Sequence, residues 1–425
     1  MRQLRVWFSL LLTLFLMTGC GTSPNVSLMP TPVVYTELGI GPLDAVPVGE
    51  RWAPRMVYYA TTRERSQGWQ RIEYDNRKGE MVRLGAALIG FGTEDLEWED
   101  LRELSSVADR AEDEIPLSIA GIVETGRWRI GETPDPEALS VFFSMLNNSI
   151  AKAYDDELLI YVHGAKVDFY NATAFAAEMD HFMRRDMTAM AFAWPSRQNI
   201  LAYGTGRDVA RAYRSAESLT DLLEMLARHS DAKKINIVSW SAGGRLVTRA
   251  LTTLSERHPE LSSAEWTRRF RIGTVYYAAS DVPRAEFLDH LDVLERVSDR
   301  LIVTVTDNDG ALKLARRFMG GGYRLGDRRG ELSPEQLQQL MEADSLEVID
   351  VSMGAQERGF DISGHRYWLD HPWASNDVLL AVRSDLRPED RGLVQSNLPF
   401  LWFIPPDYPQ RLRQSMLRPD LEMRE

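Results

Sequence analysis

The most informative segment of the chain is Ile235-Asn236-Ile237-Val238-Ser239-Trp240-Ser241-Ala242-Gly243-Gly244-Arg245-Leu246. Its first residues are typical of a buried strand and its last residues of a helix, so a small-x-Ser-x-Gly sequence stands at a sharp strand-to-helix turn. Such a turn needs small residues two positions either side of its serine, where Ser239 and Gly243 stand, and it lifts the hydroxyl above the sheet. Ser241 is therefore the candidate nucleophile. Ser239 is not, because no glycine follows it two residues later.

Short apolar runs alternate with helical stretches on both sides of this turn. We expect strands at 158–162, 187–194, 234–238, 272–278, 300–305 and 346–351, and helices at 172–185, 207–227, 243–256, 284–293 and 309–319. Additional N-terminal strands are expected at 56–62, 82–90 and 115–124. The alternation predicts an α/β fold with a mostly parallel sheet and helices on both faces. In such folds, ligands bind at the carboxyl ends of the strands.

A serine nucleophile needs a base, and the chain has seven histidines. Four lie within or at the ends of predicted helices, which is typical of surface residues: His181, His229, His258 and His290. In the α/β-hydrolase fold the order along the chain is serine, acid, histidine, so the base is expected after Ser241. His365 is the preferred base because Gly364 allows a tight loop to present it. His371 is the alternative.

The acid that orients the histidine is expected after a strand between Ser241 and His365. Asp281 follows the strand at 272–278, whereas Asp307 and Asp309 follow the strand at 300–305. The later strand is the more common position for the acid. Either aspartate there could instead cap the helix that follows, so the residues alone leave the choice between Asp307 and Asp309 open.

An oxyanion hole needs two backbone donors, one of them on the residue after the nucleophile. We expect these donors to be the N–H groups of Ala242 and of Ala165, in the loop after the strand at 158–162. Four residues are candidates for lining the substrate pocket: His163, Gly164, Trp194 and Trp240. No His/Cys cluster with metal-ligand spacing and no phosphate-binding glycine motif occurs, so neither a metal nor a cofactor is expected.

The ends of the chain and its charge indicate where it acts. Residues 1–20 combine basic residues, an apolar run and the sequence Leu16-Met17-Thr18-Gly19-Cys20. This resembles the signal peptide and lipobox of a bacterial lipoprotein, which implies cleavage before Cys20 and attachment of palmitate-type acyl chains to it. Glycine at position 21 favours the outer membrane. The formal net charge of −13 argues against a nucleic-acid partner, and one cysteine allows no internal disulfide.

The mature chain divides into four predicted parts. Residues 21–50 read as a flexible tether, because they contain Gly, Ser, Thr and Pro with little periodicity. Residues 51–155 hold N-terminal strands and a helix that pack on the core at 156–385. Residues 386–425 form a C-terminal tail. Its apolar segment at 400–406 is expected to pack on the core, with contact to lipid or a partner as the alternative.

Short motifs along residues 55–370 together resemble one family, the α/β-hydrolases catalogued as domain of unknown function nine hundred. The matching motifs, in order, are Tyr59-Ala60-Thr61-Thr62-Arg63, Val162-His163-Gly164, Phe192-Ala193-Trp194-Pro195-Ser196, Ser239-Trp240-Ser241-Ala242-Gly243, Ala278-Ala279-Ser280-Asp281, Asn308-Asp309-Gly310-Ala311-Leu312 and Gly364-His365. The resemblance implies Ser241, Asp309 and His365 as a catalytic triad. Trp240 departs from the family pattern, which has histidine there.

These observations lead to one functional expectation and two alternatives. We expect a membrane-anchored serine hydrolase of the bacterial cell envelope that cleaves an ester, esterase-like or lipase-like, at a membrane surface and faces either the periplasm or the cell exterior. The first alternative is a catalytically inactive binding or scaffolding lipoprotein that keeps the fold. The second is an amidase or peptidase that uses the same residues.

Overall fold

The structure of the chain is a computed structural model. It describes residues 26–51, 54–66, 72–93, 95–110, 114–153, 155–197, 206–319, 322–352 and 365–418. The predicted signal peptide at 1–20, the predicted lipidation site Cys20 and Gly364 therefore lie outside the described residues.

The strands of the described residues form one sheet in the order β10-β11-β9-β8-β7-β6-β4-β5-β1-β2-β3. They are β1 (Arg55–Arg65), β2 (Tyr74–Phe91), β3 (Leu117–Arg129), β4 (Glu157–Val162), β5 (Thr188–Ala193), β6 (Lys234–Trp240), β7 (Ile272–Ala278), β8 (Arg300–Val305), β9 (Leu346–Asp350), β10 (Val394–Gln395) and β11 (Leu401–Phe403). From β11 to β1 all neighbours are parallel, while β2, β3 and β10 are antiparallel additions at the two edges. This confirms the predicted mostly parallel sheet.

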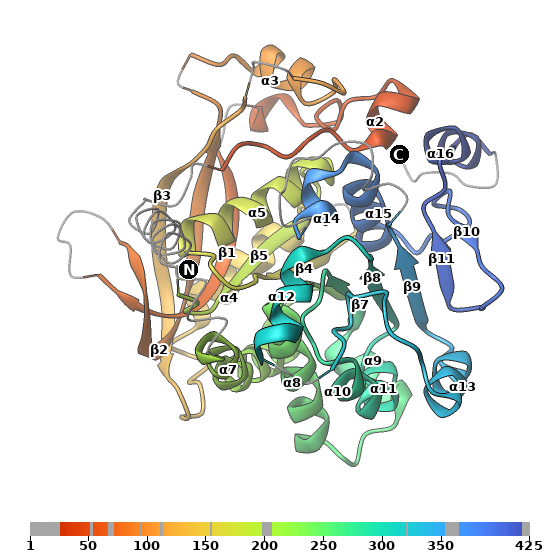
Figure 1. The fold of residues 1–425 in the computed structure, drawn as a ribbon. Helices are drawn as coiled ribbons and strands as arrows, with labels where there is room; N and C mark the ends of the chain where they lie inside the picture. The colour runs from red at the N-terminus through yellow and green to blue at the C-terminus, as the bar shows by residue number, and fades with distance from the viewer. Residues whose placement is uncertain are drawn as a thin grey trace, which may run out of the picture.

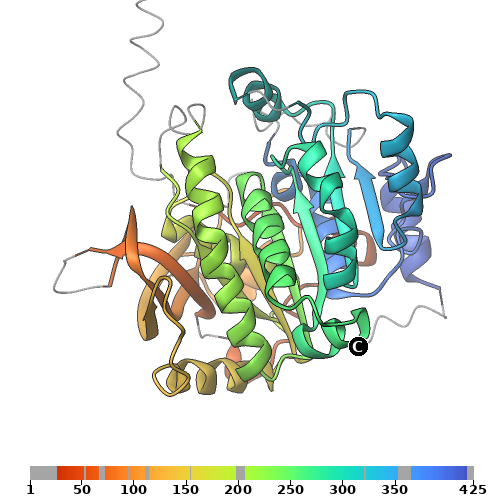
Figure 2. The same ribbon diagram turned by 90° about the horizontal axis from the view of Figure 1, so that it is seen from below.

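The helices of the described residues cover both faces of this sheet (Figures 1 and 2). They are α2 (Val33–Leu38), α3 (Trp98–Leu104), α4 (Ser140–Ile150), α5 (Phe169–Phe182), α7 (Arg207–His229), α8 (Ala242–Arg257), α9 (Ser263–Phe270), α10 (Arg284–Asp289), α11 (Leu291–Val297), α12 (Gly310–Met319), α13 (Pro334–Glu342), α14 (Tyr367–Asp370), α15 (Pro372–Arg383) and α16 (Tyr408–Met416). The single helix expected at 284–293 is instead two short helices, α10 and α11, that meet at His290.

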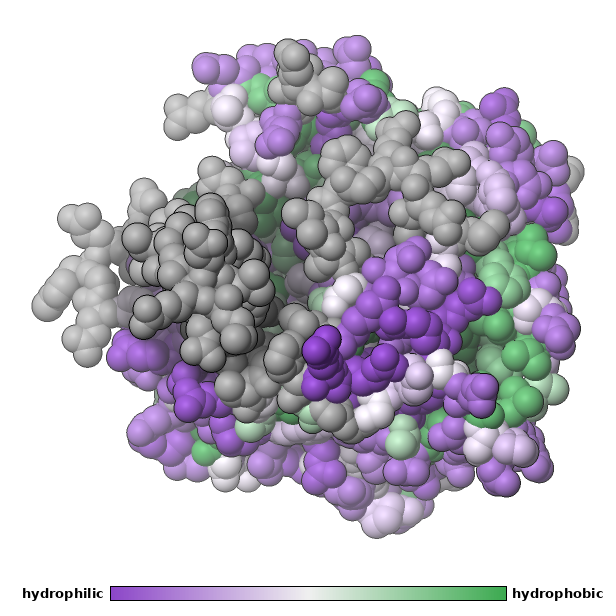
Figure 3. Space-filling model, in the orientation of Figure 1, coloured by the Kyte–Doolittle hydropathy of each residue, from purple (hydrophilic) through white to green (hydrophobic). Residues whose placement is uncertain are grey.

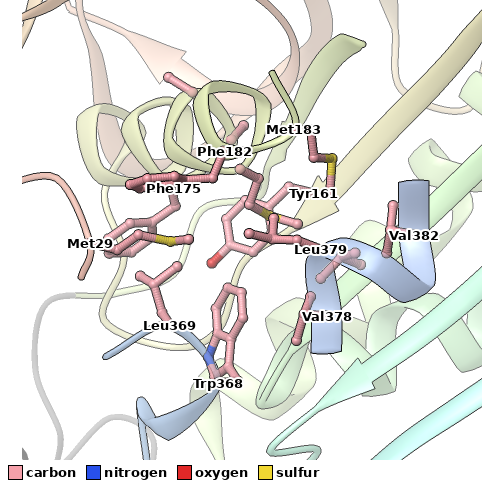
Figure 4. Packing of buried hydrophobic residues seen from close by; sticks show 14 of the residues in the cluster. Met29, Tyr161, Phe175, Phe182, Met183, Trp368, Leu369, Val378, Leu379 and Val382 are labelled. Atoms are coloured by element: carbon pink, nitrogen blue, oxygen red, sulfur yellow. The ribbon is translucent and has the colours of Figure 1, made fainter. Parts of the chain in front are cut away.

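Alternate residues of the central strands point into two separate cores. Leu159 and Tyr161 of β4 pack with α5, α14 and α15 on one face, whereas Leu158 and Ile160 pack with α7, α8 and α11 on the other. This is the side-chain alternation of a strand that is buried on both faces. The first core is drawn in Figure 4, where Phe175 of α5 lies near Tyr161 and Trp368. The sheet is thereby packed between two layers of helices.

The prediction of a flexible tether over residues 21–50 is wrong from residue 26 onward. Val26, Leu28, Met29, Val33 and Tyr35 are buried in the same core as α5, and Figure 4 shows Met29 next to Phe175. Backbone groups of this segment are also bound, since Met29 N–H donates to Glu178 of α5 and Val34 N–H to Asn376 of α15. The segment packs because its apolar residues join the core to which both helices contribute.

The C-terminal tail at 386–425 extends the sheet. β11 lies parallel to β9, with Leu401 opposite Val348 and Phe403 opposite Asp350. Ile404 after it is buried, and so is Tyr408 of α16. The apolar segment at 400–406 thus supplies an outer strand and part of a core.

Candidate active site

Ser241 stands between β6 and α8 in a strained backbone conformation. Its φ is 54° and its ψ is −119°, a region that serine adopts at a cost of roughly 1–3 kcal/mol. Hydrogen bonds on both sides hold it there: Ser241 N–H donates to the carbonyl of Ala278 (3.0 Å), and Ser241 O accepts from Asp281 N–H (3.2 Å). The predicted sharp turn is therefore present, built against the end of β7.

Glycines allow the turn to approach β4 closely. A Cβ on Gly243 would lie 2.3 Å from Val162 O and 2.7 Å from His163 O, both backbone atoms that cannot swing aside. A Cβ on Gly164 would lie 3.1 Å from Ser241 Cβ. Ser239 fits at the position before the turn because its hydroxyl donates to Tyr276 O (3.1 Å). The loop after β4 consequently passes directly beside Ser241.

His365 and Asp309 reach this serine from two other loops. His365 Nε2 lies 2.8 Å from Ser241 Oγ, and His365 Nδ1 lies 2.6 Å from Asp309 Oδ2. Asp309 is 1% exposed, and its other oxygen accepts the N–H of Leu312 (2.9 Å), which caps the first turn of α12. A buried carboxylate on Nδ1 keeps the proton there and leaves Nε2 free to accept the serine proton.

The structure brings none of the alternative residues to this serine–histidine pair. Asp281 is fully buried behind the turn, where it pairs with two arginines. Asp307 follows β8, and no hydrogen bond among the described residues joins its carboxylate to His365; its backbone N–H donates to Ser352 Oγ (3.2 Å). His371 caps α15 through Trp373 N–H. Among the described residues, only Asp309 has a carboxylate bound to His365.

The two residues predicted to supply the oxyanion hole, Ala242 and Ala165, both belong to segments next to Ser241. Ala242 is the first residue of α8, so its N–H lies at the positive end of the helix dipole. Ala165 directly follows Gly164, which approaches Ser241 Cβ. Within the described part of the chain, neither N–H donates to a protein acceptor. Both remain available to a carbonyl oxygen that becomes negatively charged.

His163 and Trp194 shape the loop after β4 from its buried side and do not line a pocket. Both are 0% exposed, and their rings stack with centroids 5.1 Å apart. Trp194 Nε1 donates to His163 O (2.7 Å). Burial and the neighbouring Arg63 lower the pKa of His163 to about 3, so this ring stays neutral. The expectation that these two residues line the pocket is therefore wrong, because their surfaces are already covered.

Trp240 lies next to the candidate base. Its Nε1 donates to the backbone carbonyl of His365 (3.2 Å), and the two rings are 5.6 Å apart. Trp368 and Phe175 pack on the other sides of the indole. Trp240 thus connects the turn that carries Ser241 to the loop that carries His365. It does so through its indole N–H bond and through ring contacts on several sides.

Sequence reasoning missed a buried charge cluster beneath the turn. Arg245 Nε lies 2.8 Å and Arg324 Nε 2.9 Å from the two oxygens of Asp281. Arg324 also donates to Ala315 O of α12 (3.4 Å). Arg245 was the signal in the sequence that could have revealed this cluster. It is a charged residue in the first turn of a helix that is otherwise mostly buried, and a buried charge needs a partner of opposite charge. The cluster joins the serine turn to the helix that starts after Asp309.

The described residues were also compared with the requirements of a metal site and of a membrane-spanning helix, and they meet neither. They contain no group of His, Cys, Asp and Glu arranged to hold a metal ion. They also contain no helix long and apolar enough to cross a membrane.

The fold and the serine turn together define an α/β hydrolase. The chain belongs to the family described as "Alpha/beta hydrolase of unknown function (DUF900)", which matches residues 141–383, more than half of its length. The predicted family and the predicted α/β-hydrolase fold are confirmed by this match. No curated protein matches the chain at a significant level.

Several solved hydrolase structures are similar to the chain at low identity. Esterase B from Lactobacillus rhamnosis is 12% identical over 38% of this chain and 59% of its own length, with a TM-score of 0.24. A lipase-esterase related protein from Clostridium acetobutylicum is 12% identical over 46% of this chain and 73% of its own, with a TM-score of 0.21. A putative hydrolase from Legionella pneumophila is 10% identical over 92% and 95%, with a TM-score of 0.23. The matched region thus spans less than two thirds of esterase B.

Proposed function

We propose that the chain is a serine hydrolase that cleaves a carboxylic ester, with Ser241 as nucleophile, His365 as base and Asp309 as the acid that orients it. The observation that carries this proposal is the continuous series of hydrogen bonds from Asp309 Oδ2 through His365 to Ser241 Oγ, at 2.6 and 2.8 Å. The strained turn supports it, because strained backbone conformations such as that of Ser241 cluster at functional sites. The binding-protein alternative has no observation in its favour.

Each proposed step conserves its atoms. Ser241 Oγ attacks the ester carbonyl carbon while His365 Nε2 accepts the serine proton. The carbonyl oxygen becomes negative and accepts the N–H groups of Ala242 and Ala165, each such donor contributing about 10²–10³ in rate. The intermediate collapses, and the alcohol leaves with the proton of His365. A water molecule then gives a proton to His365 and attacks the acyl-serine, which releases the acid and restores the hydroxyl.

A fluorophosphonate probe tests the nucleophile directly. We expect the purified wild-type protein to be labelled covalently and the Ser241→Ala variant to remain unlabelled, because only an activated serine attacks the probe at neutral pH. Labelling is measured by intact-protein mass spectrometry. His371→Gln serves as the matched control and should label like wild type, since His371 caps a helix. A folded wild-type protein that does not label would contradict the proposal, and equal labelling of Ser241→Ala would move the nucleophile elsewhere.

We also propose that the protein is attached to the bacterial cell envelope, on the outer membrane, by lipid on Cys20. The support is the lipobox-like sequence and the glycine that follows it. In cells fed an alkyne analogue of palmitate, we expect the full chain to carry the label and to fractionate with membranes. Cys20→Ala should abolish the label. A wild-type protein that carries no label, or a Cys20→Ala variant that keeps it, would contradict lipid attachment at this residue.

A further inference from the structure

One face of α12 is basic and lies in solvent. Lys313, Arg316 and Arg317 are spaced three and four residues apart and so share one side of the helix. Lys313 and Arg317 are exposed, and Arg316 lies over the ring of Tyr323 at 4.4 Å. On the opposite side, Leu312 and Ala315 are buried. α12 is therefore amphipathic, with its apolar side packed on the protein and its cationic side open.

These three cations differ from their basic neighbours in having no acidic partner. Arg328 and Arg329 nearby are paired with Asp350 and Asp327. Across the described residues, no carboxylate lies within ion-pair distance of Lys313, Arg316 or Arg317. Although the chain carries a formal net charge of −13, the part that the structure describes thus places three cations without an ion pair on one helix face. Such a surface attracts an anionic partner.

That surface lies on the helix that directly follows the candidate acid Asp309. α12 begins at Gly310, immediately after Asp309, so Lys313 is only one helical turn from the residue that holds His365. Figure 2 shows α12 above the carboxyl edge of the sheet, and Figure 3 shows strongly hydrophilic side chains over its position in Figure 1. A partner bound to α12 would therefore lie beside Ser241.

The N-terminal segment limits where a lipid on Cys20 can be. Val26 is buried, and its N–H donates to the hydroxyl of Tyr170 (3.1 Å). Tyr170 is in the first turn of α5, the end that faces the carboxyl edge of the sheet because α5 follows β4. Cys20 stands six residues before Val26, so its Cα lies within about 21 Å of Val26 whatever path the chain takes. A thirty-residue tether, as expected from the sequence, would have imposed no such limit.

We propose that the face at the carboxyl edge of the sheet docks on an anionic phospholipid surface through Lys313, Arg316 and Arg317 of α12. The short connection from Cys20 brings this face close to a bilayer, and the cationic face supplies complementary charge to lipid phosphates. Docking places Ser241 near the lipid–water boundary, where lipid-like esters are found. This inference rests on the proposed lipid attachment, which orients the protein on the bilayer, and on the proposed hydrolase activity, which acts on the esters found there.

Vesicle sedimentation tests the docking without the lipid. A chain that starts at Gly21 keeps every residue that the structure describes, so its packed fold is complete. It is mixed with vesicles of phosphatidylglycerol and phosphatidylcholine in equal amounts, or of phosphatidylcholine alone, and the bound fraction is measured. We expect binding to the anionic vesicles only, weakened by salt. Lys313→Gln/Arg316→Gln/Arg317→Gln should weaken it by about 100-fold, because each cation near an anionic surface contributes about fivefold.

A matched triple variant controls for net charge. Lys152→Gln/Arg228→Gln/Arg268→Gln removes the same charge from exposed residues at the opposite, amino edge of the sheet, and it should bind anionic vesicles like wild type or more weakly by less than about twofold. Equal binding to both vesicle types, or equal loss in the two triple variants, would overturn the inference. Hydrolysis of a soluble short-chain ester is followed in parallel. Vesicle binding without hydrolysis would count against the proposed function alone, and hydrolysis without binding against the docking alone.

Discussion

Replacing Asp309 by asparagine is expected to lower kcat for ester hydrolysis by about 10⁴ while the protein stays folded. The side-chain oxygen that caps Leu312 N–H can be retained, so the amide NH₂ would face His365 Nδ1 in place of Oδ2. Nδ1 would then become an acceptor and Nε2 would carry the proton. His365 in that tautomer cannot accept the proton of Ser241. Steady-state kinetics on a soluble ester, with circular dichroism of the same sample, measures the effect.

Asp307→Asn is the matched control for this prediction. Asp307 is two residues away and follows the same strand, and among the described residues it has no hydrogen bond to His365. Its substitution should change kcat by less than about twofold, because surface and near-surface changes outside the reacting groups have small effects. A larger loss of kcat in Asp307→Asn than in Asp309→Asn would mean that Asp307, not Asp309, is the acid that orients His365.

The contrast between these two aspartates shows why sequence reasoning stopped short of the complete site. The strand at 300–305 and the helix after it predict that carboxylates stand near the carboxyl edge. Which of them turns toward His365 depends on the phase of the first turn of α12, where Asp309 serves both as cap and as partner of the histidine. That phase is set by packing beneath the helix, which no local pattern reports. The family resemblance supplied the choice that the residues alone left open.

The fold was predicted where apolar residues follow a regular period and missed where they do not. The central strands are short apolar runs, and they were placed within a few residues of their observed bounds. β2 instead begins at Tyr74, eight residues before its predicted start, because its polar first half is held by pairing with β1. The residues after 26 were read as a tether for a similar reason. Their burial depends on packing against α5 and α15, which lie far away in the sequence.

Removing the carboxylate of Asp281 is expected to have the largest effect on stability. In Asp281→Ala the guanidinium groups of Arg245 and Arg324 would stay buried without their shared partner. Breaking a buried ion pair by removing one partner costs about 3–5 kcal/mol, and Asp281 is an ion-pair partner of both arginines. The free energy of unfolding should therefore fall by at least about 3–5 kcal/mol, measured by urea denaturation. The turn bond from residue 281 N–H to Ser241 O is a backbone bond that alanine retains, so the loss should appear first as reduced stability.

Glu80→Ala is the comparison that isolates burial from ion pairing. Glu80 pairs with Arg129 at 2.8 Å, the same distance as in the pair of Asp281 with Arg245, but the side chains of Glu80 and Arg129 are both more than half exposed. Exposed pairs contribute about 0–1 kcal/mol, so Glu80→Ala should barely change unfolding. Equal losses in the two variants would mean that burial does not determine the cost. A stable Asp281→Ala protein would contradict the predicted loss of stability, and a lowered kcat in that protein would assign the carboxylate a role in positioning the serine turn.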